Sequence, residues 1–399
     1  MIKPTKILFL NQMAGPLFRE LAEDLSLKMP ETSTLFTGHP DTLAIGSANN
    51  KLKIYKAPPY NKKSKLFRIF SWINYSLFAF WKMLKVDKNT IIFIASNPPS
   101  LGFFALLVNL FKNTRYIVLV YDMHVDVLIG RGLLDKNSFI VKFWRFINQK
   151  IWNRSLAIYT IGTVMADNLS KQFKVNNTYL ARVGVVYPWA DTERIKPILK
   201  IHNPLSSIFG QKGKITILYS GNMGMSHDID SILHAAKILK NHMNISFLLI
   251  GEGEKWKEAY NFKIDNNLNN LKVLPFQSED KLPYTMSLAD IALVSLDEGA
   301  EGFMVPSKMF YYMSAGAAVI GICKGTNDVS KIIEKSNCGM TIEPKNPKEL
   351  ANIIKALSEN KKKLQDLKKN SRQSAVSYFS RQKCSSKLIK ELLLLIKNI

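Results

Sequence analysis

Short apolar runs rich in β-branched and aromatic residues alternate with longer helical stretches along most of this chain. Repetition of strand, loop and helix is typical of a parallel sheet that carries helices on both faces. The runs form two series, which predicts an α/β protein with two doubly wound, Rossmann-like sheets. The expected strands lie at 7–10, 91–96, 116–122, 156–162 and 183–188 in the first series, and at 215–221, 245–253, 271–276, 291–296, 318–323 and 340–344 in the second.

A break separates the two series. Residues 191–213 contain charges, prolines and glycines but no clear strand, so they are expected to form a linker. A chain of 399 residues is also long for one hydrophobic core. We therefore expect a first domain over 1–190, a second over 191–375 and a helical tail over 376–399. Open α/β sheets bind ligands at the carboxyl ends of their strands, so two such domains are expected to face each other across a cleft.

The chain carries a formal net charge of +24, which draws a protein toward polyanions such as nucleic acid, anionic lipid or phosphorylated ligands. Between Lys51 and Thr90 there are ten lysine or arginine residues against one acid, Asp87, and this stretch is dense in large aromatic residues. Residues 62–86 and the similar stretch 139–154 are therefore expected to form helices that dock on an anionic membrane surface. The alternative is an ordinary buried helix flanked by surface lysines.

Several classes of protein are disfavoured by what the sequence lacks. No uninterrupted apolar stretch reaches the roughly 18 residues of a spanning helix, and the run 7–10 is expected to be a core strand rather than a signal peptide. No nucleic-acid-binding module is recognisable, so no nucleic-acid partner is expected. There is no nucleophile elbow, no metal-ligand cluster and no Walker A sequence, and no GxGxxG motif follows the first strand. The three cysteines are expected to be buried thiols.

The segment from Glu301 to Gly316, EGFMVPSKMFYYMSAG, carries the strongest indication of a binding site. Ser307 is a favourable N-cap for the short helix expected here, and Lys308 falls in its first turn. Free backbone N–H groups and the helix dipole favour an anion at that place. Glu301 lies a few residues upstream, where it could reach hydroxyl groups attached to the anion. A phosphate that bears a sugar suits this arrangement, whereas the alternative is a capped core helix with a surface lysine.

Further candidate residues follow the strands of the second series. The turn GNMG at 221–224 comes after the first of them, and its glycines would let backbone N–H groups approach an anion, although a plain tight turn has the same pattern. Gly251 and Glu252 end the next strand, where glycine permits either a tight turn or a close approach of ligand. Phe276 would stack on a base or cap the core, and without a nucleotide the core is favoured.

In the first series, polar residues end the strong strand at 116–122. Asp122 is the best candidate there for contacting a sugar or acceptor hydroxyl, because polar residues at the tip of a buried strand commonly line a cleft. His124 is expected to be a structural residue more often than a catalyst. The same caution applies to His227, just after the glycine turn.

In the order of these motifs the chain resembles glycosyltransferase family 4 of the GT-B fold, and within it the branch that builds bacterial O-antigen and capsule repeat units. The resemblance spans essentially the whole chain. Its most specific part is VPSKMFYYMSAGAAVIG at 305–321. Support in the same order comes from SNPPS at 96–100, VYDMHVDV at 120–127, YSGNMG at 219–224, IGEGEK at 250–255 and LPFQSEDKLP at 274–283.

This resemblance implies a retaining, metal-independent transferase that needs no cofactor, with the tail helix returning to the first domain. The donor would be a nucleotide diphosphate sugar, most often a UDP sugar such as a UDP-N-acetyl-hexosamine. The acceptor would be a polyprenyl-diphosphate-linked glycan. Catalytic roles would fall to Asp122 and Glu301, and acceptor or cleft roles to Gly15 and His124. The donor-binding residues would be Gly221, Asn222, Gly224, Gly251, Glu252, Phe276, Pro306, Ser307, Lys308 and Tyr311.

Departures from the family pattern bear on the donor site. The family often has an acidic pair, Glu-x7-Glu, and Tyr311 stands where the second glutamate would hold the ribose. Glu301 fits the first glutamate, with Glu298 as a rival. The arginine and lysine common after the glycine turn are also missing, so Lys308 is expected to carry more of the phosphate charge than usual.

Two rival functions stay open at this point. A nucleotide-sugar epimerase of the same fold would need only a soluble substrate and no lipid-seeking surface. A non-catalytic nucleotide-sugar-binding scaffold in a membrane assembly would explain Tyr311 and the missing basic residues. The favoured interpretation is a cytoplasmic transferase, peripheral on the inner face of the bacterial plasma membrane, because it explains both the donor motifs and the basic, aromatic stretches of the first domain.

Overall fold

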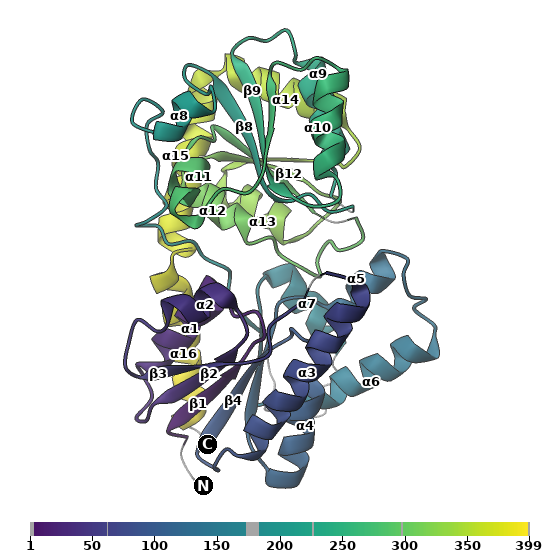
Figure 1. The fold of residues 1–399 in the computed structure, drawn as a ribbon, viewed down its shortest axis with the longest axis vertical. Helices are drawn as coiled ribbons and strands as arrows, with labels where there is room; N and C mark the ends of the chain where they lie inside the picture. Colours follow the sequence, from purple (N-terminus) through teal and green to yellow (C-terminus); the bar gives the residue numbers. More distant parts are fainter. Residues whose placement is uncertain (1–3, 62, 173–182, 226, 297, 398–399) are drawn as a thin grey trace. The chain divides into compact units, whose positions relative to one another are not determined.

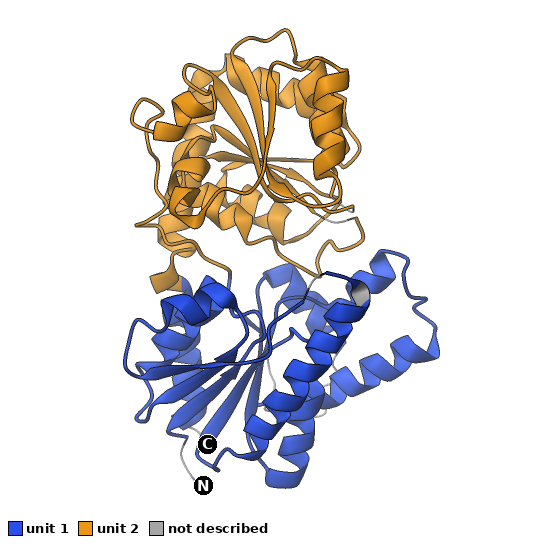
Figure 2. Ribbon diagram, viewed as in Figure 1, with its two compact units in different colours: residues 1–187, 384–399 blue, residues 188–383 orange. Residues whose placement is uncertain are grey.

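The computed structural model describes residues 4–61, 63–172, 183–225, 227–296 and 298–397. The chain forms two compact units, drawn in blue and orange in Figure 2. Unit 1 consists of Met1–Tyr187 and Cys384–Ile399, and unit 2 consists of Pro188–Lys383. The chain therefore changes unit after residues 187 and 383, where the sequence analysis expects boundaries after 190 and 375.

Unit 1 is built on a seven-stranded parallel sheet. Its strands are β1 (Lys6–Leu10), β2 (Ser33–Thr37), β3 (Leu52–Lys56), β4 (Thr90–Ala95), β5 (Tyr116–Val120), β6 (Ala157–Thr160) and β7 (Gly184–Val185). Their order across the sheet is β3-β2-β1-β4-β5-β6-β7, and Figure 1 labels β1 to β4. The sequence analysis misses β2 and β3. β3 is an edge strand that reads LKIYK, and its lysines break the apolar run that marks the other strands.

Helices connect the strands of unit 1. They are α1 (Pro16–Ser26), α2 (Pro40–Ile45), α3 (Lys65–Leu84), α4 (Leu101–Lys112), α5 (His124–Gly130), α6 (Phe139–Arg154) and α7 (Thr163–Ser170). α4 packs against both α3 and α6 (Figure 1). The last helix of the chain, α16 (Arg381–Lys397), belongs to unit 1 from Cys384 onward.

Unit 2 is built on a second parallel sheet, of six strands. These are β8 (Ile215–Asn222), β9 (Ile245–Glu252), β10 (Leu271–Leu274), β11 (Ile291–Ser295), β12 (Ala318–Ile322) and β13 (Gly339–Ile342). Their order is β10-β9-β8-β11-β12-β13. All six are strands that the sequence analysis expects, and the predicted fold class, α/β with two parallel sheets, is confirmed.

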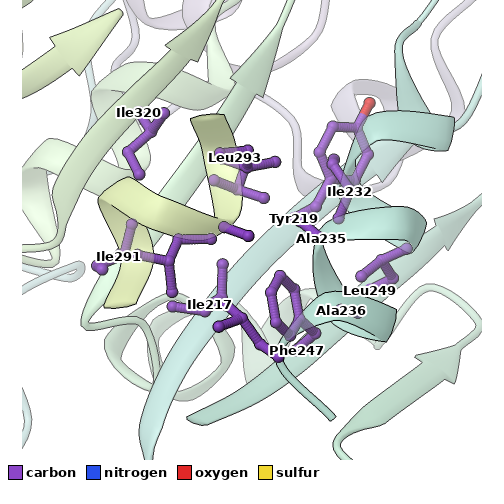
Figure 3. Packing of buried hydrophobic residues seen from close by; sticks show 14 of the residues in the cluster. Ile217, Tyr219, Ile232, Ala235, Ala236, Phe247, Leu249, Ile291, Leu293 and Ile320 are labelled. Atoms are coloured by element: carbon purple, nitrogen blue, oxygen red, sulfur yellow. The ribbon is translucent and has the colours of Figure 1, made fainter. Parts of the chain in front are cut away.

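The helices of unit 2 pack on a core of β-branched, leucine and aromatic side chains. They are α8 (Pro204–Ile208), α9 (Ile229–Ile238), α10 (Trp256–Asp265), the 3-10 turn η1 (Glu279–Lys281), α11 (Leu282–Ser287), α12 (Lys308–Ser314), α13 (Asp328–Ser336), α14 (Pro347–Glu359) and α15 (Lys361–Tyr378). Figure 3 shows Tyr219 and Phe247 of the sheet beside Ile232 and Ala235 of α9. All four side chains are fully buried, so this core removes much apolar surface from water.

The expected linker, 191–213, is in fact a packed part of unit 2. It contains α8, and Lys200 within it forms an ion pair with Asp290. The guanidinium of Arg372 in α15 donates to the carbonyls of Thr192 at 3.0 Å and Ile195 at 3.1 Å. A strand search cannot recognise this segment, because side chains from distant elements fix its position.

Candidate functional site

Lys308 and the glycine turn at 221–224 meet at the carboxyl end of β8. That strand ends at Asn222, and α12 begins at Lys308. A Cβ atom placed on Gly221 would lie 3.4 Å from Cδ and 3.5 Å from Nζ of Lys308. The lysine side chain therefore crosses the backbone of Gly221. Two of the expected donor-binding elements thus lie together in unit 2.

The ammonium group of Lys308 is held against an aromatic ring. Its Nζ lies 4.0 Å from the centroid of the Tyr219 ring. None of the ion pairs found among the described residues involves Lys308. Burial disfavours the charged form and lowers the pKa of Lys308 to about 7. An anionic ligand could supply the counter-charge that no ion pair of the described residues provides, which is the arrangement expected of a binding lysine.

Two hydrogen bonds fix the first part of the glycine turn. The hydroxyl of Tyr219 donates to the carbonyl of Asn222 at 2.7 Å. The N–H of Met223 donates to the carbonyl of Glu252 at 2.7 Å, while the side chain of Glu252 is exposed. The turn is therefore tied both to its own strand and to the neighbouring strand β9.

His227 closes the second part of the turn. Its Nδ1 accepts a hydrogen bond from the N–H of Gly224 at 3.1 Å. The N–H groups of Met223 and Gly224 thus both have acceptors inside the protein. The expectation that the turn presents free N–H groups to an anion is wrong for these two residues. What the turn places beside Lys308 is the backbone of Gly221, which the lysine side chain contacts.

Gly251 is required by strand packing. It lies opposite Gly221 in the pairing of β8 with β9. A Cβ atom on Gly251 would lie 1.9 Å from the carbonyl oxygen of Gly221, closer than any real contact. The missing side chain therefore serves the close approach of two strands, and a donor contact at Gly251 stays a prediction.

α12 is fastened by a tyrosine rather than by a serine cap. Ser307 occupies the N-cap position, as predicted, but it has helical dihedral angles, φ −60° and ψ −28°, and its side chain makes no capping hydrogen bond. The buried hydroxyl of Tyr312 instead accepts from the N–H of Ser220 at 2.7 Å and donates to the carbonyl of Ser220 at 3.0 Å. The sequence analysis misses Tyr312, although two adjacent tyrosines on a short helix must face different surroundings. Its neighbour Tyr311 is half-buried.

Three other expected donor residues have different surroundings. Pro306 is half-buried at the start of α12. Phe276 follows β10 and is 48% exposed, so its favoured interpretation as a core residue is wrong and its face is open to a stacking partner. Glu301 is half-buried near the end of β12, where burial raises the pKa of the Cys323 thiol and the charge of Glu301 adds to that rise.

Glu298, the rival of Glu301, lines a cavity in unit 2. The cavity has a volume of about 320 Å³, within the range of small-molecule pockets. His227, Asp228 and Lys345 also line it. The carboxylate of Glu298 is exposed and lies 2.9 Å from Nζ of Lys345, so the structure gives this glutamate a partner of its own.

In unit 1, Asp122 and His124 gather around Ser96. The hydroxyl oxygen of Ser96 accepts from the N–H groups of Tyr121 at 3.0 Å and Asp122 at 3.4 Å. Nε2 of His124 lies 3.0 Å from the carbonyl oxygen of Ser96, which gives this histidine a structural contact. Burial raises the pKa of Asp122, and the charges of His124 and Arg131 offset part of the rise.

Asp122 and His124 line a small pocket in unit 1. Its volume is about 50 Å³, which admits water but no sugar ring. Asp126, in the same pocket wall, is not singled out by the sequence analysis. It is buried, lies 2.9 Å from a guanidinium nitrogen of Arg145, and accepts from the amide of Gln172 at 2.9 Å. The carboxylate thereby fastens α5 to α6.

Gly15 precedes α1 in unit 1 and shows no steric need for glycine. Its φ of −68° suits any residue. A Cβ atom there would make only an ordinary contact, 3.8 Å from Nε2 of His39. Its expected place beside an acceptor stays a prediction.

One face of α3 is apolar and exposed. The opposite face carries Tyr75, Ala79 and Met83, all fully buried. α3 is therefore not an ordinary buried helix, and an exposed apolar patch of this extent marks an interaction surface. Lys62 lies outside the described residues. The exposed residues, between 47% and 69% accessible, are Leu66, Phe67, Ile69, Phe70, Ile73, Leu77, Phe78 and Trp81.

α6 repeats the pattern of α3. Phe139, Ile140, Phe143 and Phe146 are between 52% and 80% exposed. Because α4 packs against both helices, α3 and α6 flank one shared neighbour in unit 1. In the part of the chain that the structure describes, no helix combines the length and the apolar character needed to cross a membrane.

The three cysteines are buried free thiols, as the sequence predicts. Burial raises the pKa of Cys338 and of Cys384 to about 12, so neither thiol forms a ready nucleophile. Among the described residues, no group of three or more His, Cys, Asp or Glu side chains is placed to hold a metal ion.

Known proteins resemble this chain both in sequence and in fold. The family profile "Glycosyl transferases group 1" matches residues 206–374. The Pseudomonas aeruginosa protein named "Probable glycosyltransferase WbjE" is 25% identical over 80% of this chain and 79% of its own length. WcaI of Escherichia coli K12, named as a colanic acid biosynthesis glycosyl transferase, is 23% identical over 62% of this chain and 61% of its own.

Solved structures share the fold over nearly the whole chain. Anabaena Alr3699/HepE, crystallised with UDP, superposes with a TM-score of 0.71 at 14% identity, covering 98% of this chain and all of that one. WaaG, a glycosyltransferase of lipopolysaccharide biosynthesis, gives a TM-score of 0.66 at 12% identity over 97% and 99% of the two chains. Residues 206–374 of this chain thus match the group 1 glycosyltransferase family, and its two parallel sheets have the GT-B fold.

Proposed function

We propose that the protein is a retaining, metal-independent glycosyltransferase that needs no cofactor and uses a nucleotide diphosphate sugar as donor. The observation that carries the proposal is the approach of Lys308 to Gly221 inside a group 1 glycosyltransferase domain. We take the donor to be a UDP sugar, such as a UDP-N-acetyl-hexosamine. The Anabaena structures that contain UDP and UDP-glucose support a UDP sugar.

The proposed reaction exchanges one bond at the anomeric carbon. The bond from that carbon to the diphosphate oxygen breaks, and a hydroxyl oxygen of the acceptor bonds to the same carbon. The proton of the hydroxyl leaves with the nucleotide diphosphate or to water. Negative charge grows on the diphosphate, and a prepositioned cation stabilises it most in a site shielded from water. Lys308 supplies that cation in our proposal.

Two carboxylates complete the proposed site. Glu301 would accept hydrogen bonds from hydroxyls of the donor sugar, and Asp122 would orient the acceptor or donor hydroxyl. Burial raises the pKa of Asp122, which makes its carboxylate a stronger hydrogen-bond acceptor and base than an exposed aspartate. Tyr311 would take the ribose contact through its hydroxyl, and the exposed ring of Phe276 would stack on the base.

The proposed acceptor is a polyprenyl-diphosphate-linked glycan in the synthesis of a bacterial surface polysaccharide. The names of WcaI and of WaaG, which refer to colanic acid and lipopolysaccharide, support this class of product. The exposed apolar faces of α3 and α6 would bring unit 1 to the inner face of the plasma membrane, where such an acceptor lies. The net charge of +24 favours anionic lipid there.

A screen of the purified protein tests this function. Common UDP, GDP and dTDP sugars are each incubated with and without a membrane extract that contains polyprenyl-linked acceptors, and release of the nucleotide is measured. We expect release from a UDP sugar that depends on the extract. Because α- and β-linked products differ by NMR, analysis of the product also tests retention of the anomeric configuration.

The two rival functions give different results in the same screen. An epimerase converts its nucleotide sugar without any lipid extract, so a changed sugar in the soluble control would support it. A scaffold binds a nucleotide sugar and releases no nucleotide under any condition. Failure of the protein to bind any nucleotide sugar would contradict all three functions.

A further inference from the structure

We propose that Tyr219 is a positioning residue, whose ring holds the ammonium group of Lys308 over Gly221 so that it meets the diphosphate of the donor. This inference rests on the proposed function, because it concerns the same donor site. Tyr219 lies outside the residues that the sequence analysis singles out. The inference extends the proposed function, because it explains how one lysine can serve in place of the missing basic residues after the glycine turn.

The ring of Tyr219 is itself held at both ends. The residue lies in the middle of β8 and is fully buried among the core residues that cover this face of the sheet (Figure 3). Its hydroxyl donates to the carbonyl of Asn222 at 2.7 Å. The ring therefore cannot swing away without breaking a buried hydrogen bond, and it presents a fixed face.

That fixed face carries the lysine. Nζ of Lys308 lies 4.0 Å from the ring centroid, well inside the range at which a cation is attracted to an aromatic face. Such contacts stabilise a cation more strongly where water is excluded than at exposed sites. An unrestrained lysine side chain would lose rotamer entropy on binding a ligand. The ring removes much of that loss in advance, which is preorganisation.

Three successive residues of β8 contact side chains of α12. The ring of Tyr219 contacts Nζ of Lys308, and the backbone of Ser220 exchanges two hydrogen bonds with the hydroxyl of Tyr312. Cδ and Nζ of Lys308 pass within van der Waals distance of Gly221. Both the helix that carries the lysine and the path of its side chain are thus set by one short stretch of strand.

The ring also accounts for the electrostatic state of the site without ligand. It attracts the cation through its face but contributes no negative charge, and burial lowers the pKa of Lys308 to about 7. A diphosphate beside Nζ would raise that pKa. Binding of the donor above pH 7 should therefore take up a proton from solvent.

A double-mutant cycle on the full chain tests the positioning role. Binding of UDP and GDP is measured by calorimetry for wild type, Tyr219→Met, Lys308→Ala and the double variant. Methionine keeps an apolar side chain of similar length but has no aromatic face. We expect Tyr219→Met to weaken nucleotide binding about tenfold in the wild-type background and less than twofold when Lys308 is already alanine.

Further arms separate positioning from folding. Tyr219→Phe keeps the ring and should bind nucleotide within about threefold of wild type, which maintains the test even if the methionine variant folds poorly. Calorimetry in two buffers of different ionisation enthalpy at pH 8 should show proton uptake for wild type and Tyr219→Phe, and none for Lys308→Ala.

The outcomes separate the role of Tyr219 from the proposed function of the protein. An equal loss from Tyr219→Met in both backgrounds would make Tyr219 merely structural and overturn the inference, as would unchanged binding by Tyr219→Met in the wild-type background. A wild-type protein that binds neither UDP nor GDP would overturn the proposed function itself.

Discussion

The surroundings of Lys308 in unit 2 and the outer faces of α3 and α6 in unit 1 use aromatic side chains in opposite ways. In unit 2 the large aromatics Tyr219, Phe247 and Tyr312 are fully buried, and the two tyrosines fix the elements around Lys308. In unit 1, α3 and α6 turn Phe70, Trp81 and their neighbours outward. Aromatic residues therefore support a polar site in unit 2 and form an exposed apolar surface in unit 1.

This difference shows what recognition of a small anion and recognition of a lipid surface would each require. Recognition of a small anion needs one charge held in one place, which burial and hydrogen bonds provide. Recognition of a lipid surface needs exposed apolar area and positive charge, and no single residue has to be exact. We therefore expect single substitutions to have sharp effects in unit 2 and graded effects in unit 1.

The largest effect on turnover should come from Lys308→Ala. Loss of the only cation that the described residues place over Gly221 should lower nucleotide release about 10²- to 10³-fold, the usual cost of removing a charge-stabilising donor. Turnover with the preferred donor and the lipid extract measures the effect. Lys324→Ala, which removes an exposed lysine of unit 2, serves as the matched control. Turnover within threefold of wild type in Lys308→Ala would separate the lysine from the chemistry.

The surface of unit 1 should respond more gradually. The double change Phe70→Ser and Trp81→Ser removes two of the most exposed aromatics of α3, and should weaken binding to vesicles of anionic lipid at least about tenfold. Nucleotide binding should stay unchanged. Sedimentation with vesicles gives the affinity, and the pair Ile201→Ser and Met243→Ser, which removes exposed apolar side chains of unit 2, is the control. Equal losses in the two pairs would show that the face of α3 has no special part.

Two glutamates of unit 2 sharpen the comparison within the site. Glu301→Gln should lower turnover about tenfold, because a hydroxyl loses a charged acceptor. Glu298→Gln should change it less than threefold, since that carboxylate is exposed and already paired with Lys345. Measuring kcat/KM for both variants side by side decides between them. The reverse order would assign the sugar contact to the cavity that Glu298 lines.

The last expected effect concerns pH. Lys308 is charged below its pKa of about 7 and loses its proton above it, so the protein without ligand holds less of the binding form as pH rises. Donor affinity should fall about tenfold between pH 6 and pH 8, as one ionisation predicts. Titration of wild type and Lys308→Ala across this range checks the sign. An affinity that rises with pH, or the same profile in both proteins, would contradict the assignment.

The sequence predicted the sheet of unit 2 better than that of unit 1. All six strands of unit 2 are buried apolar runs and are recognisable as such, whereas β3 alternates lysine with apolar residues at a sheet edge. The segment 191–213 resembles a linker in sequence because its position depends on Arg372 and Asp290, far away in the chain. Pairing of this kind leaves no local pattern to detect.

The candidate site was predictable in its motifs and not in its contacts. The sequence pattern indicates both Lys308 and the glycine turn, and the structure places them together. Their supports, Tyr219 and Tyr312, resemble ordinary core residues in sequence. Ser307 shows the converse, because a residue of the preferred capping type makes no cap when the backbone before the helix is already helical.

A crystal structure of the protein with UDP would test the central claim most directly. The account predicts that the diphosphate lies over Gly221, with Nζ of Lys308 about 2.8 Å from a phosphate oxygen, the usual length of a charge-assisted hydrogen bond. It also predicts that the Tyr219 ring keeps its place beneath the lysine. A diphosphate bound elsewhere in unit 2, with no phosphate oxygen near Nζ of Lys308, would contradict the account.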